Sequence, residues 1–130
     1  MQIYSEYLNV WKGRTISIDK LLEIYDEMIL NINKSKTEDI LDFVKDMVDK
    51  ANKYTSVRCK WEFMSNKERL EEDSMRTALH NSFITSINII SRILESEGLD
   101  ISWREKLGDD RKVLGDFACF ISYIVGITNR

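Results

Sequence analysis

The sequence predicts an all-α fold, a single-domain helical bundle of four to five main helices with a central, apolar C-terminal helix. The 130 residues contain no Pro and only five Gly, which argues against a β-sandwich with its many tight turns. Hydrophobic residues make up 43% of the chain and charged residues 32%, so a disordered chain is not expected. No repeat, low-complexity segment or linker is present, and a chain of this length is typical of one domain, residues 1–130.

The first third of the chain contains two amphipathic patterns, and each predicts a helix. A short opening helix, which stops near Gly13, carries apolar residues at positions i, i+3, i+4 and i+7, namely Tyr4, Tyr7, Leu8 and Trp11. The second helix carries an apolar stripe of Ile18, Leu21, Leu22, Tyr25, Ile29 and Ile32. Ser17 is its expected N-cap, and the polar run Asn31–Lys36 is expected to end it.

A third helix is predicted after Ser35, because Ser35-Lys-Thr-Glu38 has the pattern of a capping box. Its apolar stripe consists of Ile40, Val44, Met47, Val48, Ala51 and Tyr54. Residues 57–63 are ambiguous, because apolar and charged residues alternate there as in a strand, whereas Tyr54, Val57, Trp61 and Met64 have helical spacing. The only candidate partner strand is the short segment Thr15–Ile18, so we favour a continued helix.

The longest helix is expected to begin at a second capping box, Ser65-Asn-Lys-Glu68, and to end at Gly98. Its apolar stripe consists of Met75, Leu79, Phe83, Ile87, Ile90 and Leu94. With Gly98 at the C′ position, Leu94 and Leu99 form the hydrophobic pair of a Schellman motif. Ser102 is the expected cap of a short helix that ends at Gly108.

The last helix is apolar on nearly all sides, as expected of a helix at the centre of a bundle. Asp109 or Asp110 is expected to cap it, since a carboxylate is favoured at the positive end of the helix dipole. The two acids could also bind a divalent cation, but no further acidic spacing accompanies them, so capping is the favoured interpretation. A stripe of small residues along this helix allows a neighbouring helix to approach closely: Gly115, Cys119, Ser122 and Gly126.

The charge and cysteine content argue against several classes of function. The net charge is −3 and neither half of the chain is basic, so binding to nucleic acid is not expected. Cys59 and Cys119 with a single His cannot supply the four ligands of a structural zinc site, and we expect no metal or cofactor. No stretch approaches the ~20 apolar residues of a membrane span, and no leader pattern is present. We therefore expect a cytoplasmic protein with two buried, reduced thiols and no membrane partner.

Polar residues on the last two long helices form the candidate site, a seam of six side chains: His80, Asn81, Asn88, Arg92, Arg111 and Asp116. His80 shares a helix face with apolar residues, so it is either a general base or ligand contact, or a core histidine satisfied by a carbonyl or carboxylate. Asp116 lies within the most apolar helix and needs a cationic partner. We expect Arg92 to be that partner, with Arg111 and Arg76 as the next candidates. The structural interpretation is favoured over the functional one for each of these groups.

Residues 65–130 resemble a family of small bacterial all-helical proteins that is catalogued only as a domain of unknown function. The resemblance rests on Leu79-His80-Asn81-Ser82-Phe83-Ile84, Asn88, Arg92, Gly108-Asp-Asp-Arg-Lys and Gly115-Asp-Phe-Ala118. It implies an all-helical fold. It implies no activity, because none is assigned to that family.

No motif of a known catalytic site is present, so the catalytic residues are unknown and an enzyme is disfavoured. The leading hypothesis is a cytosolic module that binds a protein partner, which could be a second copy in a homodimer. The alternative is a small enzyme or small-molecule binder with its site between the two long C-terminal helices, around His80 and Asp116. A regulatory partner of a DNA-binding protein has no positive support. Trp11, Trp61 and Trp103 could anchor an interface, although burial in the core is the favoured interpretation for each.

Overall fold

The computed structural model describes residues 16–128, and side chains as far as residue 126. These residues form five helices and no strand: α2 (Ile18–Lys34), α3 (Ile40–Trp61), α4 (Asn66–Ser96), α5 (Ser102–Leu107) and α6 (Arg111–Thr128). The predicted all-α helical bundle is therefore confirmed. The predicted opening helix with Tyr4, Tyr7, Leu8 and Trp11 lies outside the described residues.

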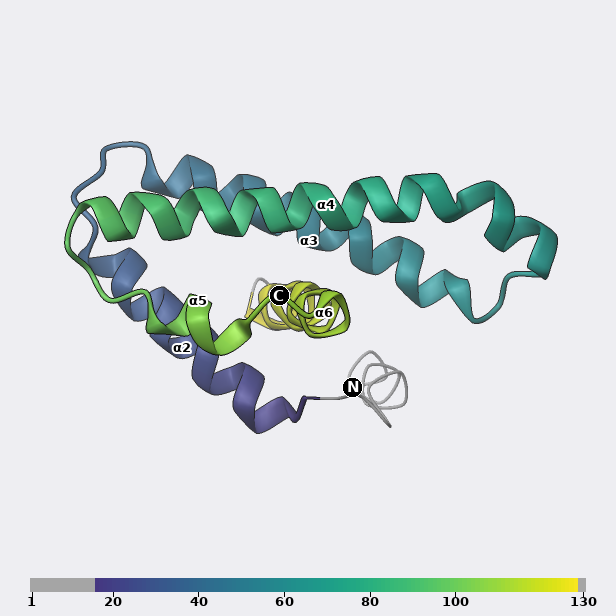
Figure 1. Cartoon of the computed structure of the whole chain (residues 1–130), viewed down its shortest axis with the longest axis horizontal. Helices are drawn as coiled ribbons and strands as arrows, with labels where there is room; N and C mark the ends of the chain where they lie inside the picture. Colours follow the sequence, from purple (N-terminus) through teal and green to yellow (C-terminus); the bar gives the residue numbers. More distant parts are fainter. Residues whose placement is uncertain (1–15, 129–130) are drawn as a thin grey trace.

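The helices are arranged around one long antiparallel hairpin, formed by α3 and α4 (Figure 1). α2 and the short α5 lie together on one side of this hairpin, and α6 lies between them and the hairpin with its axis across it (Figure 1). α6 packs mainly against α3, with smaller contacts to α2 and α4. A side chain on α6 is therefore positioned to meet α3 as well as α4.

α6 contains the longest run of buried residues in the described chain. Every residue from Leu114 to Ile121 is buried, as expected for a helix that is apolar on nearly all sides. Residues 122–125 are only half-buried, and Gly126 is exposed. The central position predicted for the C-terminal helix is therefore not confirmed.

The apolar core forms where the inner half of the hairpin, residues 40–54 and 80–96, meets α2, α5 and α6. Its largest fully buried side chains are Trp103, Phe83, Phe117, Phe120, Leu21, Ile24, Met28, Met47, Ile87, Ile90, Leu94 and Ile121. Burying a side chain of this kind contributes about 1.5 to 3 kcal/mol. Trp103, one of the three candidate interface anchors, is thus a core residue.

Four predicted helix ends are confirmed. The Ser17 side chain accepts a hydrogen bond from the amide of Lys20 at the start of α2. Both hydrogen bonds of the Ser65 capping box are present at the start of α4. Gly98 has a φ of 73° and, with the amide of Leu99 bonded to the carbonyl of Leu94, completes the Schellman motif. Asp110 caps α6 by accepting from the amide of Lys112 at 2.8 Å.

The predicted capping box at Ser35 is wrong, because the Ser35 hydroxyl accepts from the amide of Thr37 at 3.2 Å rather than from that of Glu38. α3 begins at Ile40 after Asp39, and no side chain caps it. The Ser35 hydroxyl donates to the carboxylate of Glu97 at 2.5 Å, and the amide of Lys36 donates to the same carboxylate at 2.7 Å. These bonds lower the pKa of the Glu97 carboxyl. Glu97, at the end of α4, thus holds the segment that precedes α3.

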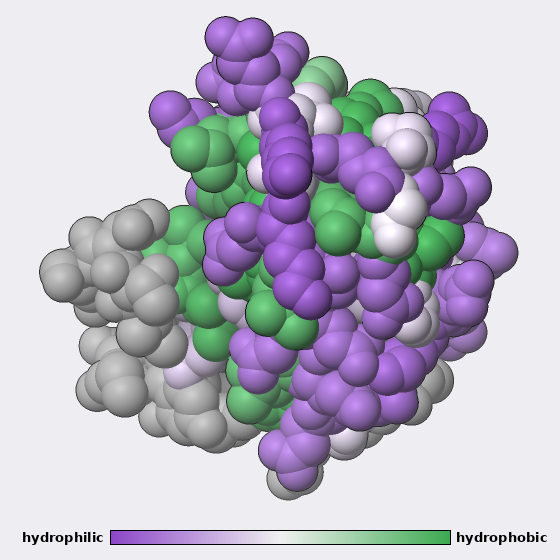
Figure 2. Space-filling view, turned by 90° about the vertical axis from the view of Figure 1, so that its left-hand side faces the viewer, coloured by the Kyte–Doolittle hydropathy of each residue, from purple (hydrophilic) through white to green (hydrophobic). Residues whose placement is uncertain are grey.

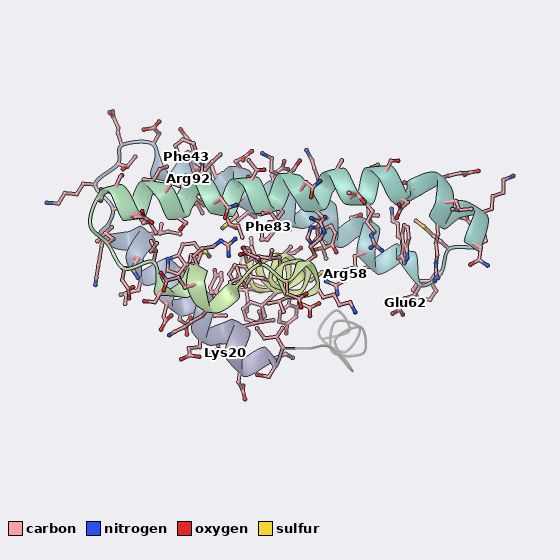
Figure 3. All side chains as sticks on the ribbon, viewed as in Figure 1. Lys20, Phe43, Arg58, Glu62, Phe83 and Arg92 are labelled. Carbon is pink, nitrogen blue, oxygen red and sulfur yellow. The ribbon has the colours of Figure 1, made fainter. Side chains whose placement is uncertain are left out.

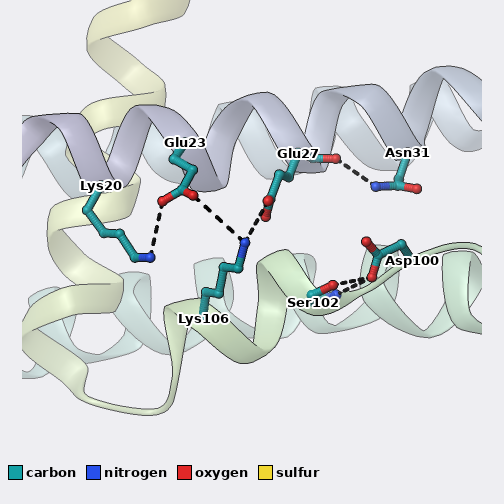
Figure 4. Close-up of polar contacts among 7 residues, drawn as sticks. All are labelled: Lys20, Glu23, Glu27, Asn31, Asp100, Ser102 and Lys106. Carbon is teal, nitrogen blue, oxygen red and sulfur yellow. Dashed lines mark hydrogen bonds and ion pairs between the residues drawn. The ribbon is translucent and has the colours of Figure 1, made fainter.

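The N-cap predicted at Ser102 is also wrong, because the N-cap position is occupied by Ile101. Ser102 is the first residue of α5, and its amide donates to the carboxylate of Asp100 at 2.9 Å. The predicted end at Gly108 is confirmed, with a φ of 69°. Lys106 then joins α5 to α2 through the carboxylates of Glu27 at 2.6 Å and Glu23 at 4.0 Å (Figure 4).

The ambiguous stretch 57–63 continues α3 as a helix as far as Trp61. The alternation does not produce a strand, because the proposed partner segment contains the N-cap and first residue of α2. The carbonyl of Trp61 at the helix end accepts from Arg69 of α4 at 2.9 Å and from the amide of Met64 at 3.2 Å. The guanidinium groups of Arg69 and Arg76 lie 5.9 Å and 4.5 Å from the Trp61 ring centre.

Candidate functional site

His80 and Asp116 both lie in a buried polar cluster between α3, α4 and α6. The Asp116 carboxylate is 1% exposed and accepts a hydrogen bond from Arg58 at 2.5 Å. The Arg58 side chain, from α3, is 11% exposed. Since two opposite charges in this position are stable only as a pair, the contact fixes α6 against α3.

Three polar side chains converge on the bare Cα of Gly115 in α6. A Cβ at this position would lie 2.8 Å from the Tyr54 hydroxyl, 3.1 Å from Arg58 Nη1 and 3.3 Å from His80 Nε2. Glycine therefore permits the close approach of α3 and α4 to α6, as the stripe of small residues predicts. The next residue of that stripe, Cys119, contacts Arg58 Nη1 through its sulfur at 3.6 Å.

His80 is held as a neutral ring. Its Nε2 lies 2.8 Å from the carbonyl oxygen of Arg111, so this nitrogen carries the proton and donates it. Burial lowers the pKa of His80, and the positive charges of Arg111, Arg58 and Arg76 lower it further, against the opposing effect of the hydrogen bond to the Arg111 carbonyl. Its Nδ1 is buried and has no hydrogen-bond partner within the described part of the chain.

The other titratable groups of the cluster are also unsuited to nucleophilic chemistry. Burial raises the pKa of the Cys119 thiol, although Arg58 opposes this effect. Burial likewise raises the pKa of Tyr54, whose ring packs edge-on against His80 with 5.0 Å between the ring centres. Both groups therefore stay protonated near neutral pH, and a protonated thiol is a poor nucleophile.

The predicted partner of Asp116 is wrong. Arg92 is exposed. It lies 12 residues after His80 in the sequence, which is about 18 Å along α4. Figure 3 shows Arg92 well to one side of Arg58 along the hairpin. The ion pair forms instead with Arg58, because α6 packs mainly against α3.

The remaining members of the predicted seam are not brought together. Asn81 is exposed, and the side chain of Arg111 is exposed although its carbonyl holds His80. Asn88 accepts from Arg104 Nε at 2.9 Å, and Arg104 also donates to the carbonyl of Gly108 at 2.7 Å. Asn88 thus helps to position the turn between α5 and α6 rather than the cluster around His80.

Tyr54 and Arg58 are the cluster residues that the sequence interpretation did not identify. They are four residues apart on α3, and therefore on one helix face. Tyr54 ends the predicted apolar stripe, so extending the stripe by one turn would have found Arg58. The uncertainty over residues 57–63 concealed this extension.

The arrangement as a whole is suited to fixing three helices in register. Its charged pair is desolvated, its histidine is neutral, and its thiol and phenol are protonated. Within residues 16–126, no group of three or more His, Cys, Asp or Glu side chains could hold a metal ion. None of the described helices is both long and apolar enough to cross a membrane.

The burial of neutral His80 predicts a specific pH dependence of stability. An unfolded histidine takes up a proton near pH 6.5, whereas folded His80 does so at a lower pH. Between these two pH values the unfolded chain binds more protons than the folded one. The stability contributed by neutral His80 is therefore fully present above about pH 6.5, and it is lost as the pH falls through the pKa of folded His80.

His80→Gln keeps an N–H donor for the Arg111 carbonyl but cannot be protonated. We expect its free energy of unfolding, measured by urea titration between about pH 4 and 7, to depend less on pH than that of the wild type. Other acids titrate equally in both proteins, so the difference between the two curves isolates His80. Parallel curves would show that the folded histidine titrates at its ordinary pKa.

A second candidate site is the outer half of the hairpin, residues 55–79. Figure 1 shows that it extends beyond the other described helices. None of these 25 residues is buried, and Phe63 and Leu70 are 89% and 80% exposed. Trp61, a predicted interface anchor, is half-buried under two arginines. At the opposite end of the molecule, the surface is mostly hydrophilic with apolar residues in separate areas (Figure 2).

No protein-family model, curated protein or solved structure matches this chain. The resemblance of residues 65–130 to a family of small bacterial helical proteins therefore stays a prediction.

Proposed function

We propose that this chain is a protein-binding module and that its interaction surface is the outer half of the α3–α4 hairpin. The observation that carries the proposal is the exposure of Phe63 and Leu70 on a segment without a single buried residue. Large apolar side chains exposed together on a projecting element are typical of interaction sites. Met75, 46% exposed, adds to the apolar surface of the same segment.

The dependence of helix stability on packing also supports a partner at this position. Most of the stability of a helix in a protein comes from packing of its apolar face rather than from intrinsic propensity. Arg58, at the start of the outer half, pairs with Asp116 of α6, but the rest of the hairpin extends beyond the other described helices towards its tip, where two arginines stack on Trp61 (Figure 1). A bound protein would supply the missing third layer.

We place the module in the cytoplasm. The proposal is supported by two cysteines that form no disulfide among the described residues. Cys119 is buried, as expected, whereas Cys59 is exposed, so the expectation of two buried thiols is wrong for Cys59. Cysteines that are not paired in disulfides are typical of reducing compartments.

A small-molecule site around His80 has less support. His80 Nδ1 is the feature in its favour, as a buried acceptor without a partner among the described residues. Against it, the neighbouring groups are already engaged, with Asp116 on Arg58 and His80 Nε2 on the Arg111 carbonyl.

Site-specific photo-cross-linking in cells that naturally express the chain tests the proposed function. A benzophenone side chain replaces Phe63 at the hairpin tip, and the matched control replaces Leu41, which is 65% exposed on the inner half. We expect a protein adduct of defined mass from position 63, weakened at least several-fold by Leu70→Ser, and none from position 41. Equal labelling from both positions, or none from position 63, would contradict the proposal.

A further inference from the structure

We propose that the partner of this surface is a second copy of the chain, bound antiparallel about a two-fold axis that passes beside Leu70 of α4. The inference rests on the proposed function and specifies its partner. It follows from the exposure of Leu70 and from the order of the charges on either side of it.

Leu70 lies at the centre of an exposed face of α4. Residues three positions away on a helix share a face, so Lys67 and Asp73 flank Leu70 on its two sides. Both flanking side chains are exposed, and neither forms an ion pair within the described chain. A leucine 80% exposed between two opposite, unpaired charges is thus available for contact.

A two-fold axis beside Leu70 makes this face complementary to itself. In an antiparallel pair of α4 helices, each residue of this face before Leu70 faces the residue equally far after it in the second copy. Leu70 then packs on Leu70 of the second copy, and Lys67 meets Asp73 of the second copy. Symmetry repeats this ion pair on the other side of the axis. The same register sets Asn66 against Ser74, which are both polar and exposed.

The charge of the whole outer half favours this partner over a strongly charged one. Outside the buried Arg58–Asp116 pair, residues 55–79 contain four basic side chains, Lys60, Lys67, Arg69 and Arg76, and five acidic ones, Glu62, Glu68, Glu71, Glu72 and Asp73, so the two signs nearly balance. A nucleic acid or a uniformly acidic protein would require an excess of positive charge. A balanced surface is compatible with a copy of itself.

The size of the contact predicts a weak dimer. The face from Asn66 to Thr77 is 12 residues long, about 18 Å of helix. Phe63, 89% exposed, lies in the turn that precedes α4, seven residues before Leu70. An interface of this extent lies at the lower end of the range for specific complexes.

Sedimentation equilibrium at about 10 to 500 μM, a range that brackets a weak interface, tests the proposal on the full chain. The wild type is expected to change from monomer to dimer with increasing concentration. Lys67→Asp and Asp73→Lys each place like charges at both contacts, so each variant alone is expected to dimerise at least tenfold more weakly. The control Lys45→Asp, an exposed change on the inner half, is expected to behave as the wild type.

Mixing the two variants gives the decisive result. A heterodimer of Lys67→Asp with Asp73→Lys contains attractive pairs at both contacts, so an equimolar mixture is expected to recover the association that each variant lacks. A mixture that stays monomeric would contradict the register that sets Lys67 against Asp73 of the second copy. A wild type that stays monomeric at every concentration would contradict the proposal that the partner is a second copy of the chain. A monomeric wild type whose position 63 still cross-links to another protein would overturn only this inference. The absence of both association and adducts would overturn the proposed function as well.

Discussion

Arg58→Ala is expected to lower the free energy of unfolding by about 3 to 5 kcal/mol, a larger loss than we expect from Gly115→Ala in the same cluster. The variant leaves the Asp116 carboxylate, 1% exposed, without the guanidinium that pairs with it in α3. Asp116→Ala should cost a similar amount, because it leaves the Arg58 charge in the same low-dielectric surroundings.

Urea unfolding followed by circular dichroism measures this loss, and Lys53→Ala provides the control. Lys53 also lies on α3 and pairs with Asp49 at 3.0 Å, but both side chains are more than half exposed. Its removal should change the free energy of unfolding by less than about 1 kcal/mol. If Arg58→Ala costs no more than Lys53→Ala, the buried pair does not hold α6 against α3.

The double variant Arg58→Met with Asp116→Leu distinguishes the effect of an unpaired charge from the effect of lost side-chain volume. Replacing a buried ion pair with apolar side chains of similar volume is often neutral or stabilising, whereas removing one partner is not. We therefore expect the double variant to recover most of the stability that either alanine variant loses. This recovery would assign the loss to an unpaired charge rather than to a cavity.

Helix ends were predictable where the capping group and the capped amide are neighbours in sequence. Ser17, Ser65 and Asp110 each cap an amide two or three residues away. Gly98 is similar, since its left-handed backbone closes a turn made by its own neighbours. Such interactions depend on local geometry alone, so the sequence pattern is sufficient to find them.

Prediction failed where the partner is distant in the sequence. Ser35 has the correct spacing for a cap, but its hydroxyl donates to the carboxylate of Glu97 and accepts from the amide of Thr37, and α3 begins only at Ile40. The partner of Asp116 could not be predicted for a similar reason, because it depends on how the helices pack. Its need for a cation followed from its apolar surroundings, whereas the choice of Arg58 over Arg92 depends on how α6 crosses the hairpin.

His80 was predictable as a core histidine, because its neighbours on the helix face are apolar. Its partner, the Arg111 carbonyl, belongs to the first residue of α6 and carries no sequence signal. The exposure of Leu70 was equally hidden, since an isolated apolar residue in a polar stretch is common on any helix. Only the position of the outer hairpin relative to the other described helices distinguishes it.

Gly115→Ala is expected to lower the free energy of unfolding by about 1 to 3 kcal/mol, the cost of one added methyl group in a packed interior. The new Cβ would lie 2.8 Å from the Tyr54 hydroxyl and 3.1 Å from Arg58 Nη1, so at least one of these groups must move. Neither moves freely, because Tyr54 packs on His80 and Arg58 is paired with Asp116.

Gly126→Ala is the matched control, since it makes the same change on the same helix where nothing lies within 4 Å of the new Cβ. Alanine is preferred to glycine in a helix by about 1 kcal/mol, so this variant should be as stable as the wild type or more stable. Urea titration of both proteins gives the comparison. Opposite signs of the two changes would show that contacts at Gly115, rather than helix propensity, require glycine there. A stabilised Gly115→Ala would instead mean that Tyr54 and Arg58 adjust at little cost, and that the cluster is looser than its short distances indicate.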